Sequence, residues 1–128
     1  MRGKVSTAVT ASVALLLGIF VTAEAASVRV RCETRANRSK ISVDGNDLAA
    51  GSYKATATSA SGANLATAGP TPAVGDEVEF DFDSNANDVA AGATRISPSF
   101  IQGNVTGSIL DATGKSVASS TVGCRVKN

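Results

Sequence analysis

Short segments in which apolar and polar side chains alternate constrain this fold more than any other feature of the chain. In residues 77–83, Val78, Phe80 and Phe82 fall on one face and carboxylates fall on the other. Residues 27–35 alternate in the same way, with apolar side chains opposite mostly charged ones. A period of two is typical of a half-buried strand, and no segment after residue 25 has a long period of 3.6 residues. The chain is therefore predicted to be all-β beyond residue 25.

We expect seven or eight short strands separated by turn residues, folded as a small antiparallel Greek-key β-sandwich of the immunoglobulin-like or fibronectin III-like kind. The expected strands cover residues 27–35, a short segment around Ile41 and Val43, and residues 53–59, 77–83, 96–101, 104–110 and 115–126, with one more near Leu65. Pro98 favours an edge position for the strand at 96–101. Residues 44–47, 69–72 and 84–94 are expected to be turns or loops, the last with a helical turn capped by Asn87 or Asp88.

The first 25 residues have the layout of a secretory signal peptide. Arg2 and Lys4 precede an uncharged, largely apolar run over residues 5–23, which leads into the small-x-small tripeptide at 23–25. We expect cleavage after Ala25. An uncleaved membrane anchor is the alternative, because 19 residues come close to the ~20 that span a bilayer. The strongly apolar part covers only residues 13–21, which favours cleavage.

Cleavage would leave residues 26–128, which form one expected β-sandwich domain of 103 residues (128 less 25) in the periplasm or the medium. Removing Arg2 and Lys4 from twelve basic residues, and Glu24 from eleven acidic ones, leaves ten of each. A neutral chain gives no electrostatic reason to expect binding to nucleic acid or, after cleavage, to a membrane.

Cys32 and Cys124 are the only cysteines, and they lie near the two ends of the expected domain. An exported chain with two thiols most simply forms one disulfide. Each cysteine is in phase with the inward-facing valines of its segment, so the bond would join the first and last strands inside the sandwich. A redox pair is the alternative, but the two cysteines are far apart in sequence and no neighbouring helix is predicted that would lower a thiol pKa.

Residues 48–53 carry the most specific local pattern. Leu48 is followed three residues later by Gly51 and two residues after that by Tyr53, which opens a predicted strand. This pattern resembles the tyrosine corner of Greek-key β-sandwiches, in which the phenol donates a hydrogen bond to backbone a few residues upstream. A lone tyrosine at the start of a strand is the alternative.

The acidic segment that begins at residue 81 could bind a calcium ion. Asp81, Asp83 and Asn85 supply oxygen atoms at alternate positions and Asp88 adds another. The fit to a helix-loop-helix calcium site is poor, because Ala86 stands where glycine is required and Gly92 where the bidentate glutamate belongs. We favour the alternative, an outward acidic strand face that runs into a turn. Calcium would instead indicate a carbohydrate-binding or adhesion module.

The same carboxylates have candidate partners within the chain. Glu79, Asp81 and Asp83 are predicted to point outward and to pair with basic side chains on neighbouring strands. The outward basic residues of the terminal strands are Arg29, Arg31, Arg125 and Lys127.

No constellation of residues indicates catalysis. The chain has no histidine, and no serine is accompanied by a recognisable base. We therefore expect a protein that is not an enzyme and needs no cofactor, calcium aside. The expected role is structural, or the binding of an unknown protein or a cell-envelope polymer.

Overall fold

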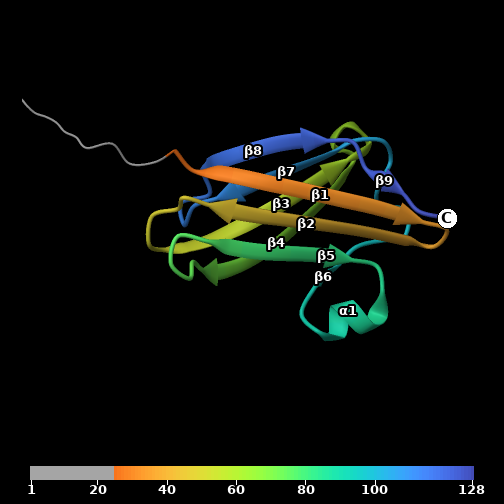
Figure 1. Ribbon diagram of the computed structural model, residues 1–128, viewed down its shortest axis with the longest axis horizontal. Coiled ribbons are helices and arrows are strands. Elements are labelled where there is room, and N and C mark those ends of the chain that lie inside the picture. The colour runs from red at the N-terminus through yellow and green to blue at the C-terminus, as the bar shows by residue number, and fades with distance from the viewer. Residues whose placement is uncertain (1–24) are drawn as a thin grey trace, which may run out of the picture.

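The computed structural model describes residues 25–128, so the leader expected over residues 1–25 lies outside it apart from Ala25. The described chain forms nine strands and one short helix (Figure 1). The strands are β1 (Ser27–Arg35), β2 (Arg38–Asn46), β3 (Ser52–Ser59), β4 (Asn64–Pro72), β5 (Val78–Asp83), β6 (Thr94–Arg95), β7 (Val105–Leu110), β8 (Ser116–Val122) and β9 (Arg125–Val126). A 3₁₀ turn (Ala60–Gly62) joins β3 to β4, and helix α1 (Ala86–Ala90) follows β5. Within this range no helix is long and apolar enough to span a bilayer.

The strands form two sheets that pack face to face. Sheet A has the order β6-β5-β2-β1-β9, and sheet B has the order β4-β3-β7-β8. The seven longer strands pair with one another only in antiparallel fashion. The two-residue strands β6 and β9 pair in parallel with β5 and β1 and form the two edges of sheet A. The chain passes between the sheets after β2, β4, β6 and β8. The predicted immunoglobulin-like β-sandwich is confirmed, with two short additional strands.

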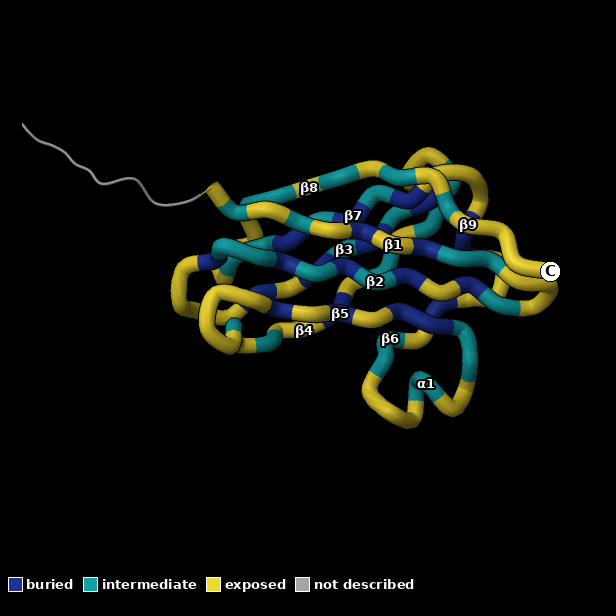
Figure 2. The backbone as a smooth tube through the Cα atoms, in the orientation of Figure 1, coloured by how far each residue is buried: buried dark blue, intermediate teal, exposed yellow. Residues whose placement is uncertain are grey.

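Burial alternates along the strands of sheet A, as Figure 2 shows. In β1, Val30 and Cys32 are buried while Arg29 and Arg31 are exposed. The alternation follows from backbone geometry, because successive side chains of a strand point to opposite faces. The sequence therefore predicts correctly which residues of β1 face inward.

β2 is longer than expected, because the turn predicted at residues 44–47 begins only after Asn46. β1 and β5 pair with opposite edges of β2, and Gly45 lies opposite Val28 on one side and Val78 on the other. Glycine suits this buried position, since a Cβ atom at Gly45 would lie 3.1 Å from Cδ1 of Leu48. Pairing on both edges thus extends a strand through residues that favour turns.

In the middle of the sandwich, sheet A contributes larger side chains than sheet B, although Val105 and Ile109 of β7 in sheet B are also fully buried. Sheet A contributes Val30, Ile41, Val43, Val78, Phe80 and Phe82, whereas the middle of sheet B contributes Ala55, Ala57, Ala68 and Gly107. A Cβ atom at Gly107 would lie 2.6 Å from Cγ2 of Val30 and 3.0 Å from Cγ2 of Val43. A side chain at position 107 of β7 would therefore require Val30 and Val43 to shift.

The connection from β2 to β3 contains the hydrogen bond of a tyrosine corner. The hydroxyl of Tyr53 donates to the carbonyl oxygen of Ala49 at 2.6 Å, and Tyr53 and Leu48 are both buried. Gly51 has a φ of 150°, which favours glycine over other residues. The corner lies at the first passage between the sheets, whereas in immunoglobulin domains it lies between the fifth and sixth strands.

The predicted disulfide is confirmed. Cys32 in β1 and Cys124, between β8 and β9, are bonded with a Cα–Cα separation of 4.8 Å across 92 positions of sequence. The single last strand predicted over 115–126 is instead two strands, because the chain leaves sheet B at Gly123 and joins sheet A at Arg125. Val126, expected to face inward, is 72% exposed as a result.

Residues 69–72 belong to β4, where a loop was expected. Pro70 and Pro72 are compatible with this strand because β4 is an edge of sheet B and has no partner on its outer side. The pairing with β3 is irregular between Tyr53 and Ala55. At this irregularity a Cβ atom on Gly69 would lie 2.8 Å from the Tyr53 carbonyl oxygen.

The strand predicted over residues 96–101 does not form. In this part of the chain only the two residues before it, Thr94–Arg95, pair with another strand, which is β5. Two buried serines of other strands hold the segment instead. The hydroxyl of Ser39 donates to the Pro98 carbonyl at 2.8 Å and accepts from the Ile101 N–H at 3.2 Å. The hydroxyl of Ser59 accepts from the Gln102 N–H at 2.8 Å. These hydroxyls satisfy backbone groups that would otherwise need a neighbouring strand.

We expect the disulfide to be a main source of stability. Cys124→Ser should lower the melting temperature by many degrees, because closing a loop of this length stabilises by roughly 4–5 kcal/mol and each kcal/mol shifts the melting temperature by about 4–8 °C. Calorimetry of the oxidised protein and the variant checks this. Two reactive thiols in the native protein, found by thiol titration, would show that the bond does not form.

Candidate functional site

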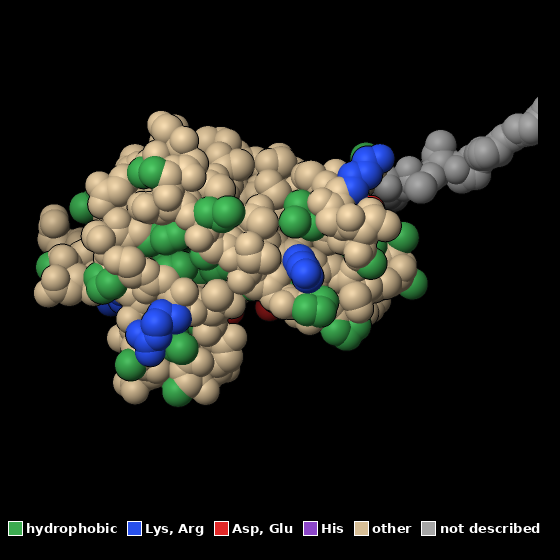
Figure 3. All heavy atoms as spheres, turned by 180° about the vertical axis from the view of Figure 1, so that it is seen from behind, with side chains coloured by type: hydrophobic (Ala, Val, Ile, Leu, Met, Phe, Trp, Pro, Cys, Tyr) green, Lys and Arg blue, Asp and Glu red, His purple; other side chains and the backbone are tan. Residues whose placement is uncertain are grey.

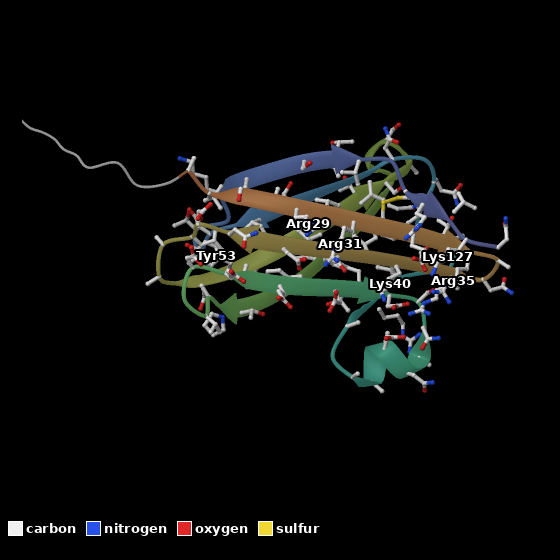
Figure 4. All side chains as sticks on the ribbon, in the orientation of Figure 1. Arg29, Arg31, Arg35, Lys40, Tyr53 and Lys127 are labelled. Atoms are coloured by element: carbon white, nitrogen blue, oxygen red, sulfur yellow. A yellow bond between two sulfur atoms is a disulfide. The ribbon has the colours of Figure 1, made fainter. Side chains whose placement is uncertain are left out.

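An open hollow of about 850 Å³ extends over sheet A from Gly123, after the end of β8, to the loop that carries α1, and it also reaches Ala68, Gly69 and Thr71 of β4 in sheet B. Charged side chains of β1, β2 and β5 form its floor, and residues 91–94 form one wall. Figure 4 shows Arg29 and Arg31 along the sheet, while Arg35, Lys40 and Lys127 gather at the end where the chain terminates. We call the outer surface of sheet A, with these side chains, the charged face.

The charged face consists of three rows that cross the strands, as the strand registers define. The first row contains Asp83, Lys40, Glu33 and Arg125, on β5, β2, β1 and β9. Charges alternate in sign along this row, so each acidic group has a basic neighbour. Glu33 also accepts a hydrogen bond from Arg35 at 2.9 Å, and this bond is the main cause that lowers the pKa of the Glu33 carboxyl. The first row is balanced within the molecule.

The other two rows are not balanced in this way. One contains Asp81, Ser42 and Arg31, and the other contains Glu79, Asp44 and Arg29, in each case on β5, β2 and β1. The acidic end of each row lies on β5 and the basic end on β1, with β2 between them. The two ends are therefore about 9–10 Å apart, twice the spacing of neighbouring strands.

The predicted pairing of Glu79 and Asp81 with basic residues of the terminal strands is wrong. Arg31 pairs instead with Asp44 at 2.9 Å, and Asp81 accepts a hydrogen bond from the Ser42 hydroxyl at 3.0 Å. Among the described residues neither Glu79 nor Arg29 forms an ion pair. The cause is the strand order, because β2 separates β5 from β1.

Asp83 has a partner, but that partner is Arg38 at the start of β2. The Arg38 guanidinium donates to both oxygens of Asp83, at 2.7 and 3.0 Å, and to Asp88 at 2.9 Å. Asp83 was expected on a solvated face, yet its side chain is 2% exposed because the α1 loop folds back over it. Arg38 carries no local sequence signal for this role, because the strand register places Lys40 opposite Asp83 and Arg38 two residues earlier on β2.

Burial alone would raise the pKa of Asp83, since it disfavours the charged form. The hydrogen bonds from Arg38 and from the Asn85 N–H outweigh burial, so the pKa of Asp83 lies below its ordinary value. The same pair raises the pKa of Arg38. Both groups are therefore charged over the physiological range, and the pair fastens the α1 loop to sheet A.

The four candidate calcium ligands do not converge on one point. Asp83 and Asp88 meet at the Arg38 guanidinium, Asp81 faces Ser42, and the Asn85 side chain caps α1 by accepting from the N–H groups of Asn87 and Asp88. Asn85 is thus the cap, in place of the expected Asn87 or Asp88. Within residues 25–128 no group of three or more histidine, cysteine, aspartate or glutamate side chains is arranged to hold a metal ion.

No protein-family model matches the chain, and no curated protein matches it. Among solved structures, the chain is similar to the CARDB domain of the PF1109 protein of Pyrococcus furiosus, which was crystallised in complex with di-metal ions. The two share 11% sequence identity over 77% of this chain and 84% of that one, with a TM-score of 0.34. This likeness carries no inference about metal binding or function.

We expect Arg38→Gln to destabilise the protein by as much as about 3–5 kcal/mol, because it leaves the buried Asp83 carboxylate without its counter-charge. Arg31→Gln is the matched control, since it breaks an exposed pair worth about 1 kcal/mol or less. Urea unfolding measures both, and Arg38→Gln combined with Asp83→Asn should recover much of the loss. Equal effects of the two single arginine changes would contradict this account.

The effect of Arg38→Gln should also depend on pH. The pKa of Asp83 is lower in the folded chain than in the unfolded chain, so the ion pair stabilises fully above the unfolded value of about 3.9. This stabilisation disappears as the pH falls through the folded pKa. The difference between the wild type and Arg38→Gln should therefore shrink in acid.

We expect calcium to leave the melting temperature almost unchanged, because an ion at the α1 loop would have to displace Arg38 from two carboxylates. A bound ion at a hundredfold excess over its Kd would stabilise by about 2.7 kcal/mol, which corresponds to a rise of roughly 10 °C or more. Thermal melts with calcium and with chelator distinguish the two cases. Such a rise, if Asp88→Asn abolished it, would favour the carbohydrate-binding or adhesion module.

Proposed function

We propose that this protein is an exported, disulfide-locked interaction module that binds a partner through the charged face. The observation that carries the proposal is the pair of unbalanced rows, which place acidic groups on β5 and basic groups on β1 on one face of the sheet. A partner that presents both signs of charge, on a protein or on a cell-envelope polymer, would complement them.

Stability alone gives no reason for this arrangement of charges. Asp44 and Glu79 lie directly opposite each other on β2 and β5, and like charges in that position destabilise a sheet. Arg31 offsets the charge of Asp44 in part, but Glu79 is exposed and has no such neighbour. A basic group supplied from outside would relieve this repulsion, which supports a role in binding.

The opposite face of the molecule has a different character. Lys54 is the one charged residue in the four strands of sheet B. Hydroxyl side chains there bond to one another, with Thr106 and Thr121 at 2.6 Å and Ser108 and Ser119 at 2.9 Å. Figure 3, which views the molecule from behind, shows few charged side chains. These four hydroxyl groups of sheet B thus have partners within the sheet.

The export in this proposal is supported by the leader pattern and by the disulfide. Disulfides form and persist outside the reducing cytosol. The hollow is also open at the surface, where a partner in the periplasm or the medium would reach it.

Site-specific photo-crosslinking tests the proposal. The photoreactive residue p-benzoyl-L-phenylalanine replaces Ser42, at the centre of the charged face, and in a control it replaces Ser108, at the centre of sheet B. Both serines are half-buried, mid-strand and hydrogen-bonded to a neighbouring strand, so the two sites are matched. After irradiation of the producing cells, material from outside the cytoplasm is analysed by mass spectrometry.

We expect a discrete adduct from position 42 and none from position 108, with the exported chain beginning at or near Ala26. The yield of the adduct should fall at high ionic strength, since exposed charges are screened beyond about 8 Å at physiological salt. Equal yields at the two positions, or no adduct at position 42, would contradict the proposal.

A further inference from the structure

The two unbalanced rows of the charged face are complementary to themselves. Each row runs from acidic on β5 to basic on β1, and the two rows have the same polarity. A second copy of the same face, turned so that its β1 lies over β5 of the first, would place base over acid at both ends of both rows. We propose that the partner on the charged face is a second copy of this chain. The inference rests on the proposed function, since it names the partner for the same surface.

Charge complementarity selects one orientation of the second copy. In a symmetric face-to-face dimer the two-fold axis lies in the interface, either along the strands or across them. An axis across the strands would place β1 over β1 and β5 over β5, so that like charges would meet. An axis along β2 exchanges β1 and β5, so that opposite charges meet. The charged face therefore fits a dimer whose two-fold axis follows β2.

This orientation supplies the partners that the strand order denies within one molecule. Asp81 would face Arg31 of the second copy, and Glu79 would face Arg29 of the second copy. The symmetry repeats both pairs, and Arg31 would be shared between Asp44 of its own chain and Asp81 of the second copy. Arg29 would thus bring a basic group beside Glu79, where the repulsion from Asp44 acts in the single chain.

The centre and one end of the charged face limit the strength of this contact. Asp44 would approach Asp44 of the second copy, although Arg31 remains close to it at 2.9 Å. The row of Asp83, Lys40, Glu33 and Arg125 is already balanced and adds little. The association should therefore be electrostatic in origin, weaken steeply with ionic strength, and respond to charge changes on β1 and β5 more than to any others.

Charge reversal followed by sedimentation velocity tests the inference. Variant one carries Glu79→Arg and Asp81→Arg, which makes both strands basic. Variant two carries Arg29→Glu and Arg31→Glu, which makes both strands acidic. A control carries Lys54→Glu and Lys115→Glu, which changes the net charge as much as variant two does but lies outside the charged face. Thermal melts establish that every variant is folded.

We expect the mature wild-type protein and the control to be dimers at low ionic strength and monomers at high ionic strength. Variants one and two should each be monomers at low ionic strength, because like charges would meet in their dimers. An equimolar mixture of the two should form a heterodimer, and a chain with all four changes should dimerise again. Renewed dimerisation of the chain with all four changes is the sharpest result, since that chain again carries opposite charges on β1 and β5 and only opposed stripes of charge explain its recovery.

The inference is overturned by a wild type that stays monomeric at low ionic strength, by variants that still dimerise alone, or by a mixture that does not associate. Its failure is separable from failure of the proposed function. An adduct at position 42 with a different molecule, beside a monomeric protein in solution, refutes the second copy and keeps the charged face as a binding site. No adduct at position 42 refutes the binding site itself.

Discussion

The close approach of the two sheets at Gly107 is the constraint on which the rest of the sandwich depends. Val30 and Val43 of sheet A occupy the space that a side chain on β7 would need. Ala55 and Ala57 on β3 extend this region of small residues on sheet B, and both are fully buried. Around Gly107 the larger side chains of sheet A thus meet small residues of sheet B, whereas Val105 and Ile109 of β7 are large and fully buried, and the interior fills without tryptophan.

A core of this kind buries less apolar area per residue than a core rich in aromatic side chains. Contacts at the edges and ends of the sandwich therefore contribute a larger share of its stability. The disulfide joins β1 to the segment that leaves sheet B, and the buried serines Ser39 and Ser59 hold the irregular chain over residues 96–104. Arg38 fastens the α1 loop through Asp83. These contacts secure segments that the two sheets do not hold by strand pairing.

The two outer faces of the sandwich carry different types of polar side chain. Sheet B carries hydroxyl groups that bond across neighbouring strands, whereas sheet A carries charges on every long strand. The position of β2 at the centre of sheet A keeps the acidic groups of β5 apart from the basic groups of β1. This separation leaves Glu79, Asp81 and Arg29 without an ion pair among the described residues, and it is the physical basis of the binding role that we propose.

The sequence by itself determined which side chains of β1 and β5 face the core, with Asp83 as the exception. That choice depends on the direction of successive side chains along a strand, which is a local property. The cysteine pairing was likewise determined, because the chain has only two cysteines. The position of Tyr53 at the start of a strand followed from a pattern confined to six residues.

Only the tertiary structure decided which strands are neighbours. The passages between the sheets place β2 between β1 and β5, so Arg31 pairs with Asp44 and not with Asp81. They also bring Arg38 to Asp83 and bury that carboxylate under the α1 loop. Strand order follows from contacts between residues far apart in the chain, and no local pattern of charge or hydropathy encodes it. The rows of the charged face, and therefore the candidate site, became visible only in the folded sheet.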